Sequence, residues 1–165
     1  MNAATILFSS VVALVLLDAA GASHAVAAQR KGRAGASACN ALAGDAPAVT
    51  TTSSSAKVPP AAGGQLSDGT YVLSAMTIYT PLPIPSMSLS TVMQVTGSTI
   101  QQVATMNGQE KRFTTSFSTS GSSITMADTC PVAKSGIYGY TATPTEFRMY
   151  LNSPIGKIEQ TYTKR

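Results

Sequence analysis

The chain has 165 residues, a formal net charge of +4 and 44% hydrophobic residues, with one histidine and no tryptophan. The histidine, His24, lies in a segment that we expect to be removed, so the mature chain would lack the base of Ser-His-Asp and Cys-His catalysis and the commonest zinc ligand. The basic residues are scattered and form no stripe with interleaved aromatic residues, which argues against specific nucleic-acid binding.

The N-terminal region resembles an export signal. Residues 3–17 form an uncharged apolar run that ends at Asp18 and is followed by Ala25-Val26-Ala27, a small-residue cleavage pattern. The run is shorter than the roughly 20 residues of a membrane-spanning helix. We therefore expect residues 1–27 to be a signal peptide and the protein to be exported, to the periplasm, the cell surface or the medium. The mature chain would have no transmembrane segment. Because no lysine or arginine precedes the run, an uncleaved N-terminal anchor is the alternative.

Residues 28–65 are predicted to form a tail. They contain no aromatic residue and almost no large aliphatic one, but a threonine and serine run at 50–55, Pro59-Pro60 and Gly63-Gly64. Such a segment buries too little apolar surface to offset the entropy lost on ordering. We therefore expect a disordered, flexible spacer, with a tail that inserts into a partner's cleft as the alternative.

Cys39 in this tail and Cys130 are the two cysteines of the chain. In an oxidising compartment the default is one disulfide between them, which would tie the tail to the end of a strand. Cys39 follows Ala36-Ser37-Ala38, so a lipidated lipoprotein cysteine is a second interpretation. Free or intermolecular thiols are a third.

From Leu66 onward the chain changes to alternating apolar and polar residues. Residues 93–103, 117–126 and 140–149 each contain two alternating runs around a short break of Gly, Pro, Ser or Thr, which is the pattern of a β-hairpin. Strands are predicted at 70–79, 89–96, 99–106, 112–119, 122–129, 137–143, 146–151 and 156–163. Consecutive hairpins give an antiparallel up-and-down meander, and about eight strands close most easily into a small barrel. We thus expect an all-β barrel domain over residues 66–165.

Three prolines, Pro81, Pro83 and Pro85, alternate between the first two predicted strands. Because proline has no N–H to donate to a sheet, residues 80–86 are predicted to form an extended loop, folded over one end of the barrel.

The interior of such a barrel is either filled by its side chains or leaves space for one small ligand. Methionine suits both cases, because its shape is adaptable. The residues that alternation places on the inner face, and that are candidates to line a ligand site, are Met93, Phe113, Phe117, Met126, Phe147, Met149 and Tyr162. Gln160 shares this face and needs hydrogen-bond partners there.

The acidic residues of the predicted barrel do not suggest a catalytic pair. A glycosidase needs two carboxylates facing each other at roughly 5–10 Å. Asp128 has the inward phase of its strand, whereas Glu146 and Glu159 have the outward phase and Glu110 lies in a turn. We therefore predict no catalytic residues, and no cofactor or metal site.

Three short motifs carry a family resemblance. They are Asp68-Gly-Thr-Tyr-Val-Leu73, which opens the first strand, Asp128-Thr-Cys-Pro131, which closes the fifth, and Glu159-Gln-Thr-Tyr-Thr-Lys164, which ends the last. With the order of the hairpins, they make residues 66–165 similar to the small lipocalin-like domains of secreted bacterial proteins. The resemblance implies a barrel that can bind a small ligand, and no catalytic residues. Lipocalins pack a tryptophan under a basic side chain at the closed end of the barrel. Here Tyr71 would take the place of the tryptophan, and Arg148 or Lys164 would supply the cation.

The sequence therefore favours a secreted, non-enzymatic barrel that binds a small apolar molecule. The alternative is a protein-interaction or inhibitor module at the cell surface, whose partner would be a surface protein.

Overall fold

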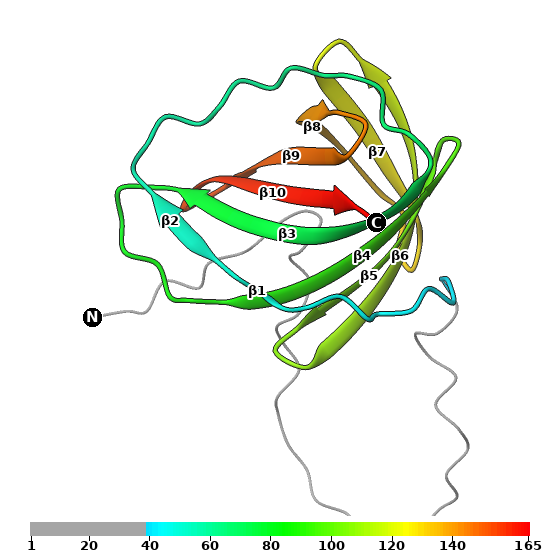
Figure 1. Cartoon of the computed structure of the whole chain (residues 1–165), viewed down its shortest axis with the longest axis horizontal. Coiled ribbons are helices and arrows are strands. Elements are labelled where there is room, and N and C mark those ends of the chain that lie inside the picture. Colours follow the sequence, from blue (N-terminus) through cyan, green and yellow to red (C-terminus); the bar gives the residue numbers. More distant parts are fainter. Residues whose placement is uncertain (1–38) are drawn as a thin grey trace, which may run out of the picture.

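The computed structural model describes residues 39–165 (Figure 1). The predicted signal peptide and residues 28–38 of the predicted tail lie outside this range. The described residues form strands and loops and contain no helix. The strands are β1 Val49–Thr50, β2 Thr52–Ser54, β3 Gly69–Tyr79, β4 Ser88–Thr96, β5 Thr99–Met106, β6 Gln109–Ser120, β7 Ser123–Cys130, β8 Lys134–Ala142, β9 Glu146–Ser153 and β10 Gly156–Lys164. Within residues 39–165, no segment is a helix long and apolar enough to cross a membrane.

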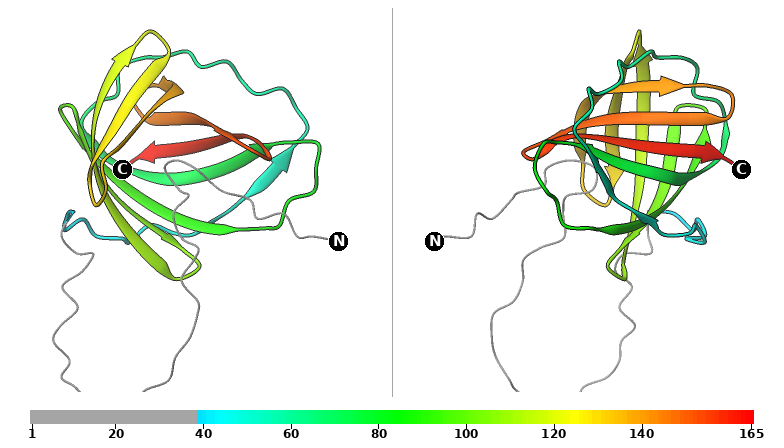
Figure 2. Two further views of the ribbon diagram at one scale, coloured as in Figure 1. Left: turned by 180° about the vertical axis from the view of Figure 1, so that it is seen from behind. Right: turned by 60° about the vertical axis from the view of Figure 1, so that its left-hand side comes forward.

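Strands β3 to β10 form a closed antiparallel barrel. Each pairs with the next along the chain, and β10 returns to pair with β3 (Figures 1 and 2). This order confirms the predicted up-and-down meander. The eight predicted strands all occur, with bounds within a few residues of those read from the alternation.

Side chains on the inner faces of the strands fill much of the barrel. A hollow the size of a water molecule beside a side chain would leave part of its surface accessible. Ten inward side chains are instead 2% exposed or less, namely Tyr71, Leu73, Ile78, Met93, Ile100, Ile124, Tyr140, Phe147, Met149 and Tyr162. The ring centroids of Tyr140 and Phe147 lie 6.3 Å apart and those of Phe147 and Tyr162 5.9 Å apart. The Tyr162 hydroxyl donates to Gln160 Oε1 at 3.0 Å, which gives that buried amide the partner it requires.

The proline-rich segment is a loop between β3 and β4, as predicted. Ile84 and Met87 of this loop pack against the buried core. Its extended form therefore covers core side chains at one end of the barrel.

The prediction of a flexible spacer is wrong for residues 39–65, because the barrel wall offers this segment open strand edges. β3 and β4 pair only through residues 69–72 and 92–95, and β1 and β2 lie where the two strands separate (Figure 2). β1 pairs with β4 and β2 with β3. Backbone bonds run from Thr51 N to Met87 O at 2.8 Å and from Thr80 N to Ser54 O at 2.9 Å. Pairing of these edges orders a segment whose side chains bury little.

The Cys39–Cys130 disulfide is confirmed. Both thiols are thereby used, so the lipidated and free-thiol interpretations of Cys39 are wrong. Asn40, the next residue, donates from Nδ2 to Phe113 O at 2.8 Å and to Gln102 O at 3.1 Å. The tail thus starts from a fixed point on the barrel wall.

A second fixed point follows at Gly63-Gly64. Gly63 N donates to Tyr140 O at 2.8 Å, and Ala142 N donates to Gly63 O at 2.7 Å. Both glycines have positive φ, and an added Cβ would collide with the carbonyl oxygen of Gly121 at Gly63 and of Ala142 at Gly64. Only glycine fits these two positions without strain.

Candidate functional site

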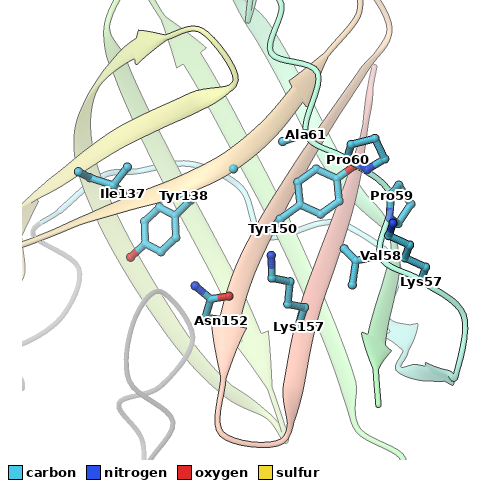
Figure 3. A pocket seen from close by; sticks show the side chains of 11 residues that line it. Lys57, Val58, Pro59, Pro60, Ala61, Ile137, Tyr138, Tyr150, Asn152 and Lys157 are labelled. Carbon is cyan, nitrogen blue, oxygen red and sulfur yellow. The ribbon is translucent and has the colours of Figure 1, made fainter. Parts of the chain in front are cut away.

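A second separation of strands lies between β8 and β9. Their ladder covers only residues 139–142 of β8 and 147–150 of β9, and the strands diverge from there (Figure 3). Residues 57–61, here called the strap, cross the outside of the barrel beside this opening. Strap and strands line a partly open cavity of about 340 Å³, here called the strap pocket. Its volume falls at the lower end of the range for small-molecule sites, about 300–1,000 Å³.

The lining of the strap pocket is part apolar and part polar. The apolar residues come mainly from the strap, and the polar residues mainly from the barrel wall. The apolar lining is Val58, Pro59, Pro60, Ala61 and Ile137, and the polar lining is Lys57, Tyr138, Tyr150, Asn152 and Lys157, with Gly139 between them. A molecule with an apolar body and a polar end would match this division.

The strap is held close to the wall for identifiable reasons. It lies between the β2 pairing and the Gly63 bonds to β8, and Pro59-Pro60 restricts its backbone to extended forms. At Gly139, the position of an added Cβ would be 3.2 Å from Ala61 Cβ. The absence of a side chain there lets the strap approach β8, so the pocket is shaped by the sequence of both segments.

A charged network lies beside the pocket on the outer face of the barrel. The Tyr79 hydroxyl donates to Glu159 Oε2 at 2.6 Å, and Arg148 Nη1 lies 3.5 Å from Glu159 Oε1. Glu159 is 6% exposed and pairs in register with Tyr150 of the pocket. Burial, and then the hydrogen bond to Glu159, raises the pKa of Tyr79 to about 12. The Glu159 carboxylate is thus already engaged by a hydroxyl and a guanidinium group.

Arg148 itself is held by a second carboxylate. Its Nε donates to Glu146 Oε1 at 2.6 Å, and this hydrogen bond raises the pKa of the guanidinium group. The network therefore places one cation between two carboxylates.

The two lysines of the strap pocket have no such partners. The side chains of Lys57 and Lys157 make no ion pair or hydrogen bond with another described residue, and no carboxylate lines the pocket. Figure 3 shows the Lys157 side chain between those of Asn152 and Val58, with its ammonium group directed toward Tyr150. The pocket is therefore electropositive.

The residues predicted to line a lumen all lie on the inner face of the barrel. Met93, Met126, Phe147, Met149 and Tyr162 belong to the buried core, and Phe117 packs against it. Phe113 shares their face, because it pairs with Gln102, which pairs with Met93. None of the seven lines the strap pocket. Sequence reasoning missed this pocket because it assigned residues 57–61 to a flexible spacer; the pair Pro59-Pro60 was the available signal of a stiff segment.

The cation at the end of the barrel is Lys164, and the prediction of Arg148 for this place is wrong. Lys164 Nζ lies 5.8 Å from the centroid of the Tyr71 ring and donates to Ser67 Oγ at 3.0 Å. Arg148 pairs in register with Thr161, one position out of phase with the inward pair Phe147 and Tyr162, and so faces outward.

The other predicted acids are engaged in local contacts. Asp128 Oδ1 accepts a hydrogen bond from Thr115 Oγ1 at 2.6 Å, and Glu110 pairs with Arg112 at 2.8 Å. In residues 39–165 no three His, Cys, Asp or Glu side chains are placed to hold a metal ion.

Comparison with protein-family models, with curated proteins and with solved structures finds no match to this chain.

Proposed function

We propose that the protein is an exported, non-enzymatic binding protein whose ligand site is the strap pocket. The observation that carries this proposal is a lining that combines apolar residues, most of them from the strap, with two lysines whose side chains have no partner among the described residues. Ligand sites are typically concave, largely apolar and equipped with a few polar groups that fix orientation.

The proposed position of the site differs from the lumen that the alternation predicted as the place for a ligand. A lumen ligand would need a hollow among the inward side chains, and ten of them are 2% exposed or less. The buried rings of Tyr71, Phe147 and Tyr162 fill space in the lumen that a ligand would have to occupy. We therefore propose a ligand site on the outside of the barrel wall and not in the lumen.

The non-enzymatic role and the export are supported by separate observations. The sole histidine precedes the described residues, and Glu110, Glu146 and Glu159 are held in ion pairs. A structural disulfide such as Cys39–Cys130 persists in oxidising compartments, which favours export.

The test uses two exposed apolar residues of similar kind. Ile137 lines the pocket and is 71% exposed, whereas Val132 is 66% exposed and lies outside the lining. The disulfide-bonded, ¹⁵N-labelled protein is titrated with decanoate and with 1-decanol, and amide shifts are followed by NMR. We expect saturable shifts at the strap and at residues 137–139, weakened about tenfold by Ile137→Asp and unchanged by Val132→Asp. Shifts confined to Met93, Phe147 and Tyr162, or no saturable shifts with either probe, would refute the proposal.

A protein-interaction role is the second candidate. Leu82, Val132 and Ile137 are exposed large hydrophobic side chains, a kind of residue that can anchor a partner. Insertion of the tail into a partner's cleft does not support this role, because residues 49–54 of the tail are paired with β3 and β4. Loss of partner capture with both Ile137→Asp and Val132→Asp, without a change in ligand shifts, would favour it.

A further inference from the structure

The charge of the strap pocket indicates what kind of ligand it takes. Resting on the proposed binding role, we infer that the ligand carries an anionic head, a carboxylate or a phosphate, on an apolar body, and that Lys157 binds the head.

The electrostatic balance of the lining favours an anion. Two lysines line the pocket and no acid does. Glu159, which follows Lys157 on the same face of β10, is engaged by Tyr79 at 2.6 Å and by Arg148 at 3.5 Å. An anion in the pocket would therefore meet unpaired ammonium groups without a competing carboxylate, and such charge-assisted contacts are the stronger class of hydrogen bond.

The placement of the donors also favours an anion. Lys157 and Asn152 pair in register across β9 and β10, so both side chains project from the same face at the diverging end of β9. Figure 3 shows Lys157 in the pocket lining, with Asn152 to one side and Val58 to the other. Ammonium and amide N–H groups both donate to oxyanions. The head of the ligand would lie at this polar end.

The apolar part of the lining favours a ligand with an apolar body. Val58, Pro59, Pro60 and Ala61 of the strap present apolar surface to the pocket. Ile137 of β8 adds a further apolar side chain and is otherwise largely exposed to solvent. A free inorganic anion would leave this surface unused, whereas an amphipathic anion would cover it.

The experiment compares ligands that share one alkyl chain and differ in their polar head group. The disulfide-bonded protein is titrated by NMR with decanoate, decyl phosphate and 1-decanol at low salt. We expect decanoate or decyl phosphate to bind at least about tenfold more tightly than 1-decanol, with the largest shifts at Asn152 and Lys157. The tighter of the two anions identifies the head. The difference should shrink at high salt because the pocket is open to solvent.

Three variants isolate the role of Lys157. Lys157→Gln should weaken anion binding about tenfold and leave 1-decanol binding unchanged, and Lys157→Arg should keep the anion preference. Lys134→Gln removes the same charge from β8 outside the lining and should have little effect.

The outcomes separate this inference from the proposed function. Equal binding of 1-decanol and both anions in the pocket would overturn the anionic head and leave the binding role standing. Equal weakening by Lys157→Gln and Lys134→Gln would show an effect of net charge and would also overturn it. If none of the three probes shifts the pocket residues, the proposed function and the inference both fail.

Discussion

At the scale of single residues, the outer face of β3, β9 and β10 holds a buried carboxylate between a tyrosine hydroxyl and an arginine guanidinium group. Glu159 accepts from the Tyr79 hydroxyl and lies near Arg148, which in turn is bound by Glu146. A carboxylate buried this far is stable only while its partners remain. The network thus fixes the side chains next to Tyr150, one wall of the strap pocket.

Ionisation of the Tyr79 hydroxyl should make the free energy of unfolding depend on pH in the alkaline range. Its pKa is raised to about 12, whereas a tyrosine in the unfolded chain titrates near 10. Between about pH 10 and 12 the unfolded state therefore binds fewer protons than the folded state, so the free energy of unfolding falls as pH rises. This contribution is complete below pH 10 and lost through pH 12. Urea unfolding at several pH values in this range should show a shallower fall for Tyr79→Phe; the same slope in both proteins would contradict the assignment.

Predictions for single residues were correct where they followed the alternation of side chains along a strand. Lys164 above Tyr71 was one of two cations that the family resemblance allowed. Arg148 was the wrong one because alternation along β9 turns it outward, one position after Phe147. Asp128 lies inward as its phase indicated, and its hydrogen bond to Thr115 gives it a structural role at the end of β7.

At the scale of elements, the barrel strands were predictable because each carries its own alternation. β1 and β2 were not, because five residues of Thr, Ser and Val have no apolar periodicity. Their order comes from pairing with edges of β3 and β4 that the barrel strands leave open. The strap pocket was missed for the same reason, since it depends on where the ordered tail crosses the wall.

Gly63 tests the anchoring of the strap, and Gly108 is a matched control. Their φ angles are +71° and +75°, but an added Cβ meets Gly121 O at Gly63 and nothing within 4 Å at Gly108. Gly108→Ala should cost only the strain of positive φ, about 1 kcal/mol. Gly63→Ala adds a collision with backbone, so we expect a loss in the free energy of unfolding of about 2–4 kcal/mol. Equal losses in the two variants, measured by urea unfolding, would show that the strap needs no close approach at Gly63.

At the scale of the whole molecule, the barrel has two places where neighbouring strands separate. The separation of β3 and β4 is filled by residues 49–54 of the chain itself. The separation of β8 and β9 contains the strap pocket. The same tail therefore completes the wall at one place and forms one side of a cavity at the other, with the disulfide fixing its start at Cys39.

Removal of the disulfide should affect these places before the core. The bond links cysteines 91 positions apart, and the chain-entropy model gives such a loop about 4–5 kcal/mol of stability. Because residues 39–65 are part of the ordered fold, we expect most of this value in the disulfide-free variant Cys39→Ser with Cys130→Ser. Hydrogen exchange should show early loss of protection at the Thr51 and Thr80 amides, which bond to Met87 and Ser54, while Phe147 and Met149 stay protected. A loss below about 1 kcal/mol, or simultaneous exposure of all four amides, would show that the tail is not a separate unit held by Cys39.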